Sequence, residues 1–143
     1  MRNMERIVKI SQLVRVFPTE HWSWDETGEI CLDDISIAIH EAVPEISEPY
    51  GDMWRYPALE QKSREWHIGR IIYFINRPSE IKGIVIEVNR IKSSNSLQYS
   101  ILDGWHRYAA ARWLYDQGEM IEINCILEGG KYELERGSLD FNN

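Results

Sequence analysis

The chain has 143 residues and a formal net charge of −7 at pH 7, with 43% hydrophobic and 27% charged residues. Such a length and balance are typical of one globular domain with a proper core, and no apolar run approaches the roughly 20 residues that a membrane-spanning helix needs. The acidic balance argues against direct binding to duplex DNA, which usually requires a basic face.

The N-terminal half carries weaker signals than the C-terminal half. Residues 7–18 predict a short strand followed by an irregular segment, and Gly28 interrupts the polar stretch after it. Apolar side chains at helical spacing predict a helix over residues 31–43. From Pro44 to Pro57 we expect a loop whose aromatic residues either cover a ligand or anchor the loop to the core. A helix is predicted from residue 59 until it ends at 76–78. The aromatic residues of the loop are Tyr50, Trp54 and Tyr56.

The C-terminal half has clear periodicity. Alternating apolar residues over 81–91 and 97–102, with the turn-rich segment 92–96 between them, predict a β-hairpin. A helix is predicted from Trp105 to about Gln117, ended by Gly118, and a strand over 120–127. The tail, residues 137–143, is expected to be poorly ordered. This order of elements predicts an α+β domain in which helices pack on a small mixed sheet.

The segment Asp103-Gly104-Trp105-His106-Arg107 joins the second hairpin strand to this helix. The free backbone N–H groups and the positive dipole at a helix start attract anions, typically phosphate. Gly104 lets a ligand approach the backbone, and Arg107 suits bidentate phosphate binding. Cationic side chains are mildly unfavourable there unless an anionic ligand completes the site. The alternative is that Arg107 pairs with a carboxylate and His106 is an ordinary core or surface residue.

The sequence YSILDGWHRYAAARWL, residues 99–114, resembles the signature of the ParB/sulfiredoxin-fold superfamily, a strand followed by DGxHRxxAA at a helix start. The resemblance extends to IKGIVIEV before it and to IEINCIL after it. Near the N-terminus, ISQLVRVFPTEHW is similar to the opening strand and the L-x-P-x-E segment of the family. Residues 31–65 have no counterpart in the family and are expected to form an inserted loop or helical region. The resemblance therefore implies a single domain of this fold over residues 1–143.

Membership would imply nucleotide binding. The phosphates of ATP, ADP or CTP would lie at Asp103, Gly104, Trp105, His106 and Arg107, with Asp103 shaping the turn or orienting Arg107. Trp105 stands where sulfiredoxins have their catalytic cysteine, so sulfiredoxin activity is not expected. Chromosome-partitioning ParB proteins carry a helix-turn-helix domain after the nucleotide domain. This chain ends at Asn143, and we do not expect it to partition chromosomes alone.

The nearest parallel is the free-serine kinase branch of the superfamily, in which a glutamate of the P-x-E segment lies near the reacting hydroxyl. Glu20 matches that position, and a carboxylate there could accept the hydroxyl proton. The alternative is a surface acid beside His21. His106 is the second candidate catalytic residue. His67 and Arg70 lie one helical turn apart and would either add a phosphate contact or form a solvated edge; with His21 they are the possible accessory residues.

The leading functional hypothesis is NTP-dependent phosphoryl chemistry, by a small-molecule kinase acting on a hydroxyl substrate or by a nucleotide hydrolase. Mg²⁺ would arrive with the nucleotide, because the histidines lack metal-ligand spacing. A non-catalytic module that binds a protein partner or forms a homodimer is the alternative. A nuclease is a third hypothesis, and the low pI and the lack of a carboxylate cluster argue against it.

Two further features of the sequence bear on the cellular compartment of the protein. Residues 1–10 lack the apolar core of a signal peptide. Cys31 and Cys125 lack C-x-x-C spacing, so we expect buried, reduced thiols. Both features favour a cytoplasmic protein.

Overall fold

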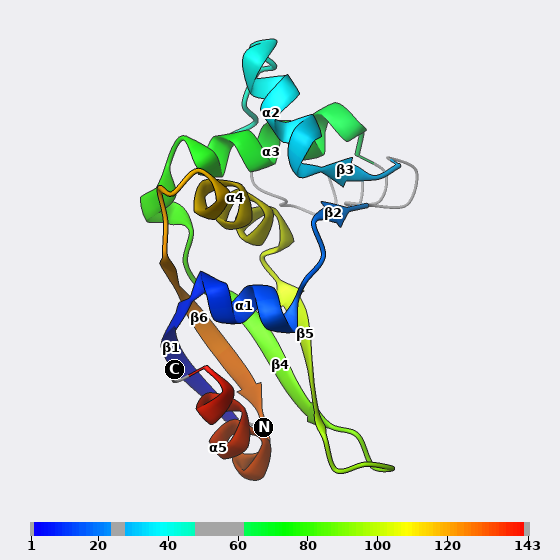
Figure 1. The fold of residues 1–143 in the computed structure, drawn as a ribbon, viewed down its shortest axis with the longest axis vertical. Helices are drawn as coiled ribbons and strands as arrows, with labels where there is room; N and C mark the ends of the chain where they lie inside the picture. Colours follow the sequence, from blue (N-terminus) through cyan, green and yellow to red (C-terminus); the bar gives the residue numbers. More distant parts are fainter. Residues whose placement is uncertain (1, 24–27, 48–61, 142–143) are drawn as a thin grey trace, which may run out of the picture.

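The computed structural model describes residues 2–23, 28–47 and 62–141. A four-stranded mixed sheet has the order β1-β6-β4-β5, and a two-stranded sheet pairs β2 with β3 (Figure 1). This arrangement confirms the predicted α+β class and mixed sheet. The elements are β1 (Arg2–Lys9), α1 (Ile10–Val16), β2 (His21–Trp22), β3 (Ile30–Cys31), α2 (Leu32–His40), α3 (Arg64–Ile75), the 3-10 turn η3 (Pro78–Glu80), β4 (Ile84–Arg90), β5 (Leu97–Asp103), α4 (Trp105–Asp116), β6 (Glu122–Gly129) and α5 (Lys131–Asp140).

The central strand β6 joins the two halves of the sheet. It pairs antiparallel with β1, from Arg2 opposite Gly129 to Lys9 opposite Glu122, and parallel with β4. Side chains alternate along it, so that Ile123, Cys125 and Leu127 are buried while their neighbours are partly exposed. The hairpin β4–β5 completes the sheet, with a register shift between Val85 and Ile86. The sheet thereby presents one continuous apolar face to the helices.

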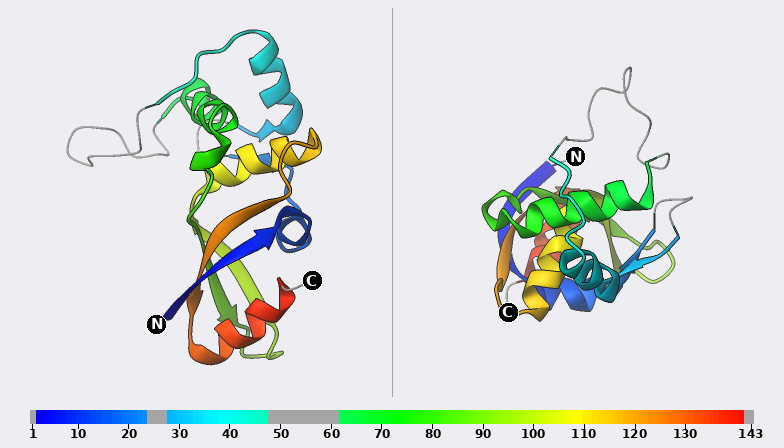
Figure 2. Two further views of the ribbon diagram at one scale, coloured as in Figure 1. Left: turned by 90° about the vertical axis from the view of Figure 1, so that its left-hand side faces the viewer. Right: turned by 90° about the horizontal axis from the view of Figure 1, so that it is seen from above.

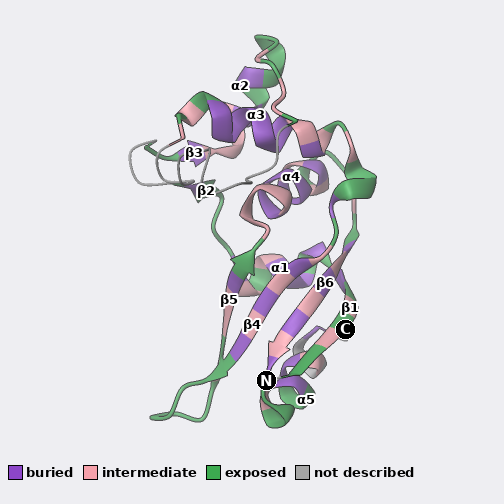
Figure 3. Ribbon diagram, turned by 180° about the vertical axis from the view of Figure 1, so that it is seen from behind, coloured by how far each residue is buried: buried purple, intermediate pink, exposed green. Residues whose placement is uncertain are grey.

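Helices α3 and α4 cross above the end of the sheet and pack on each other (Figures 1 and 2). Three consecutive alanines, Ala109–Ala111, are fully buried in α4 and let neighbouring backbones approach closely. Eight residues of α3 are buried, and Figure 3 shows buried positions where α3 faces α4. At Gly69 a Cβ atom would lie 2.5 Å from Ile46 Cγ1. Glycine therefore lets the chain before residue 48 cross α3 closely.

Three parts of the fold differ from what the sequence analysis described. The segment expected to be irregular after the first strand forms α1, because Ile10 and Leu13 lie on one buried helical face. A short β2–β3 pair was not predicted. Residues expected to form a poorly ordered tail belong to α5 and to the turn after it, where the Phe141 ring contacts Tyr99 at 5.3 Å between centroids. Residues 142–143 lie outside the described part of the chain.

The other predicted elements are found with shifted boundaries. The predicted helix over 31–43 is α2, that over 59–76 is α3, and that over 105–117 is α4. The hairpin and the following strand are β4, β5 and β6. Most of the aromatic loop, with Tyr50, Trp54 and Tyr56, lies outside the described residues.

Two further sequence features can be placed. Cys125 is buried and Cys31 partly buried, and both thiols are free. Within the described ranges, the helices are all too short or too polar to cross a bilayer.

Candidate functional site

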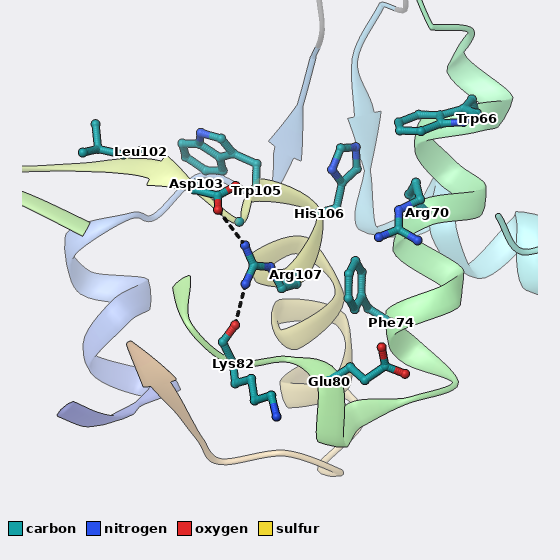
Figure 4. A pocket seen from close by; sticks show the side chains of 11 residues that line it. Trp66, Arg70, Phe74, Glu80, Lys82, Leu102, Asp103, Trp105, His106 and Arg107 are labelled. Carbon is teal, nitrogen blue, oxygen red and sulfur yellow. Dashed lines mark hydrogen bonds and ion pairs between the residues drawn. The ribbon is translucent and has the colours of Figure 1, made fainter. Parts of the chain in front are cut away.

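A pocket of about 580 Å³ opens where the β5–α4 junction meets α3 (Figure 4). This volume is in the usual range for small-molecule sites. The lining combines aromatic rings, both signs of charge and the exposed backbone of the helix start. It consists of Trp66, Arg70, Phe74, Glu80, Lys82, Leu102, Asp103, Gly104, Trp105, His106 and Arg107.

The five residues predicted to hold phosphates all line this pocket, at the turn from β5 into α4. Gly104 has φ +109° and ψ +23°, in the left-handed region that L-residues rarely adopt. Its carbonyl accepts the first backbone hydrogen bond of α4, from Tyr108 at 2.8 Å. The N–H groups of residues 105–107 have no acceptor one turn earlier in the helix. The helix start therefore directs donors toward the pocket.

Arg107 is fixed at two points of the pocket wall. Its Nη1 donates to the Lys82 carbonyl at 2.5 Å, and its Nη2 lies 3.2 Å from Asp103 Oδ2 (Figure 4). The Asp103 side chain is 74% exposed, whereas that of Arg107 is 20% exposed. The carboxylate pairing considered from the sequence is thus present, and it orients a guanidinium that also lines the pocket.

His106 and His67 form a hydrogen-bonded pair. His67 Nδ1 and His106 Nε2 are 2.8 Å apart, and the two ring planes are only 6° from parallel, with 5.1 Å between the ring centroids. The indole of Trp66 meets both imidazoles edge to face. Burial, together with the neighbouring His67, Arg70 and Arg107, lowers the pKa of His106 to about 3. His106 is therefore neutral at physiological pH, and it shares a hydrogen bond with His67.

Arg70 brings a second guanidinium to the pocket from α3. It is only 9% exposed, its Nη1 donates to the Ile46 carbonyl at 2.9 Å, and its guanidinium lies 4.7 Å from the Phe74 ring centroid. With Lys82 and Arg107, the lining contains three cationic side chains against the carboxylates Asp103 and Glu80. The excess of positive charge and the helix start favour an anionic ligand.

Three aromatic residues, Trp66, Phe74 and Trp105, line the same pocket from α3 and α4. Aromatic rings offer flat apolar surfaces on which a planar ligand group can stack. Trp105 also lines a smaller neighbouring pocket of about 300 Å³, together with Thr19, His21, Trp22 and Ser23. Cationic side chains and aromatic rings thus line the same cavity.

Arg70 was predicted as a possible phosphate contact, whereas five other lining residues were not predicted as site residues: Trp66, Phe74, Glu80, Lys82 and Leu102. Trp66, Arg70 and Phe74 follow one another at i, i+4 spacing, which places them on one face of α3. That spacing could have identified the helix face toward the ligand. Glu80 and Lys82 have no such spacing in the sequence. They line the pocket because η3 and the segment before β4 pass next to it, which depends on tertiary packing.

Glu20 does not line either of these pockets. Its carboxylate is 62% exposed and lies 3.0 Å from Arg112 Nη2, farther along α4. His21 lines the smaller pocket, and its Nδ1 lies 3.6 Å from Glu29 Oε1. The carboxylates that the structure places in the larger pocket are Asp103 and Glu80, the latter accepting a hydrogen bond from the Tyr73 hydroxyl at 3.0 Å.

In the described part of the chain, no three His, Cys, Asp or Glu side chains converge as a metal site would require. No known family model matches this sequence, and neither a curated protein nor a solved structure matches it.

Proposed function

We propose that this protein binds a nucleotide in the pocket between α3 and the β5–α4 junction. The observation that supports this most is the meeting of the Gly104–Arg107 turn with the side chains of Arg70 and Lys82 in one cavity. Backbone N–H groups at a helix start and guanidinium groups are the donors that phosphate binding uses. The phosphates would lie against residues 104–107.

The aromatic part of the lining supports a nucleotide over a free phosphate. Trp66 and Phe74 lie on α3, across the cavity from the turn that would hold the phosphates (Figure 4). A base stacked on an aromatic ring gains about 1–3 kcal/mol. The base would therefore occupy the α3 side of the pocket.

The resemblance of residues 99–114 to the ParB/sulfiredoxin-fold signature supports the same ligand. In relatives of that family the corresponding turn holds nucleotide phosphates, and here the turn follows a strand and begins a helix as the motif requires. The resemblance favours ATP, ADP or CTP as the nucleotide.

We further propose NTP-dependent phosphoryl chemistry at this site. The bond between the γ-phosphorus and the bridging oxygen would break, the acceptor hydroxyl or water would form the new P–O bond, and its proton would pass to a carboxylate. Asp103 and Glu80 line the pocket and are the carboxylates available for this role; Glu20 pairs with Arg112 instead. Mg²⁺, which neutralises phosphate charge, would be held by Asp103 and retained waters.

Thermal unfolding with ATP, ADP, CTP and GTP, each with Mg²⁺, tests the binding. A nucleotide at about 100 times its Kd stabilises the fold by roughly 2.7 kcal/mol, which raises Tm by at least about 5 °C for a chain of this size. We expect this rise with at least one nucleotide, its loss in Arg107→Ala, and a partial rise in Arg107→Lys, which keeps the charge without the bidentate geometry.

Arg136→Ala is the matched control, because it removes an exposed arginine from α5, which does not line the pocket. Each shift is compared with the nucleotide-free Tm of the same variant, since Arg107 also holds Asp103 and Lys82. An absence of any shift with all four nucleotides, or an equal shift in Arg107→Ala, would contradict the proposal.

The second candidate is a nucleotide-responsive module without turnover, which would act on a protein partner. Glu20 favours this candidate. This residue was expected to be the general base, but it lies outside the pocket lining and pairs with Arg112. Product formation separates the two candidates. The enzyme is supported if the protein releases ADP or phosphate and Asp103→Asn abolishes this release while the nucleotide still binds. Nucleotide binding without release supports the module.

A further inference from the structure

We propose that two copies of this chain associate through the open edge of β1 and form one continuous sheet around a two-fold axis. β1 lies at the edge of the four-stranded sheet, where β6 is its neighbour in the described part of the chain. Seen from this side, β1 lies in front of the other strands, and α1 and α5 lie on one face of the sheet (Figure 2, left). The described elements therefore leave this edge uncovered.

The backbone of β1 has hydrogen-bonding groups that point away from β6. The N–H of Ile10, which continues the register of β1 with β6, donates to the Ile121 carbonyl at 2.8 Å. Successive residues of a strand direct their N–H and C=O groups to opposite sides, so the even-numbered residues of β1 bond to β6. The backbone groups of Glu5, Ile7 and Lys9 thus face the open edge, where they can pair with a second strand.

The same three residues have their side chains on the uncovered face of the sheet. Val8 is buried against the helices, whereas Glu5, Ile7 and Lys9 are exposed, Ile7 by 60%. Charged side chains usually protect an edge strand from pairing. Here the two outward charges have opposite signs and flank an exposed apolar residue, so they favour one partner strand over others.

One register of an antiparallel β1–β1 pair matches these charges. With the two-fold axis at Ile7, the two Ile7 side chains lie opposite each other, and Glu5 of each copy lies opposite Lys9 of the other. Paired residues in a continuous sheet share a face. Glu5 is the single acidic residue of β1, and Lys9 is the single cation of β1 on the same face. Charge complementarity therefore identifies a second copy as the partner, in this register.

The size of the pairing determines its strength. Residues 5–9 of each copy take part, because α1 begins at Ile10, and this is far fewer than the roughly 20–30 residues a side of a standard stable interface. We expect a reversible dimer that forms at micromolar to millimolar concentration. The pocket lies at the end of β5, the opposite edge of the sheet, so the dimer leaves it open and does not depend on the proposed function.

Sedimentation velocity of the full chain over this concentration range, without nucleotide, tests the association. We expect Glu5→Lys and Lys9→Glu, which each place like charges opposite each other at both ends of the pair, to raise the Kd of the dimer by about tenfold or more. Glu5→Lys combined with Lys9→Glu restores the opposite pairs and should return the Kd to near the wild-type value. Glu41→Lys is the matched control, because it makes the same charge change at an exposed residue after α2.

Amide hydrogen exchange of the wild type is a second measurement, which needs no variant to fold. We expect the N–H groups of Glu5, Ile7 and Lys9 to exchange more slowly as the protein concentration rises, while the amides of β5 keep their rates. A monomer at millimolar concentration would overturn the inference. A dimer whose concentration-dependent protection lies outside β1, or a folded double variant that associates as weakly as the single variants, would overturn it as well.

Discussion

The residues of the β5–α4 turn combine features that are unfavourable for an isolated helix. A histidine and an arginine occupy the first turn of α4, which has no acidic residue, although cations oppose the helix dipole there. The structure reduces this cost in two ways. Asp103 and the Lys82 carbonyl hold Arg107, and His106 stays neutral beside His67. The remaining positive potential is available to a ligand.

The low pKa of His106 predicts a pH dependence of stability. Its pKa is about 3 in the folded chain against 6.5 for the free side chain, so between these values the unfolded chain binds the extra proton. The contribution of His106 to the free energy of unfolding is fully present above about pH 6.5. It decreases as the pH falls toward 3, with a slope of up to about 1.4 kcal/mol per pH unit. Urea unfolding from pH 7.5 to 4.5 should show a steeper loss for the wild type than for His106→Asn.

His40→Asn is the control for this experiment, because His40 is an exposed residue at the end of α2. The free energy of unfolding of His40→Asn should decrease with falling pH at the same slope as that of the wild type. Equal slopes for the wild type and His106→Asn would show that His106 titrates normally in the folded chain.

At the residue scale, the sequence could predict which candidate side chains lie together only where they are neighbours in the chain. Asp103 to Arg107 are contiguous, and the structure brings all five to one pocket. Glu20 was chosen through a resemblance in a separate segment, and its placement depends on long-range packing. There the nearby guanidinium of Arg112 binds it instead.

At the scale of elements, the junction of β5 with α4 depends on one backbone conformation. Gly104 takes φ +109°, and a Cβ there would lie 3.2 Å from both Arg107 Nη2 and Ile84 Cγ1. The strand can enter the helix without a longer loop because the residue lacks a side chain. This conformation aims the first turn of α4 at the pocket.

Gly104→Ala should therefore lower the free energy of unfolding by about 2–3 kcal/mol, from backbone strain and crowding together, and weaken nucleotide binding. Gly118→Ala is the matched control. Gly118 also has positive φ, +74°, but an added Cβ meets no atom within 4 Å, so we expect a loss of about 1 kcal/mol and unchanged binding. Urea unfolding and nucleotide titration measure both effects, and equal behaviour of the two variants would contradict this account.

Elements with strong periodicity were predicted, and those that depend on tertiary packing were not. β4, β5, α4 and β6 have alternation or helical spacing that their own residues specify. α1 has only 7 residues, and α5 has a glycine, Gly137, inside it. A Cβ at Gly137 would lie 3.0 Å from Val88 Cγ1, a tight contact that the local sequence does not reveal.

At the scale of the whole molecule, the pocket is a product of distant segments. His67 and His106 are 39 residues apart in the sequence. Arg70 precedes η3 in the sequence and Lys82 follows it, and both line the cavity. The packing of α3 on α4 brings these groups together at the end of the sheet (Figure 1). The sequence predicted the turn and the helix over residues 59–76 as separate elements, but not that α3 packs on α4 and lines the same pocket as the turn.

The most direct test of the central claim is a ¹H–¹⁵N titration of the wild-type protein with Mg·ATP, with Mg·ADP and adenosine alongside. We predict that the largest shifts fall on the amides of residues 104–107 and on the indole N–H groups of Trp66 and Trp105, and that adenosine leaves the turn amides nearly unchanged. Largest shifts at residues outside this pocket, or no shifts at millimolar nucleotide, would contradict the account.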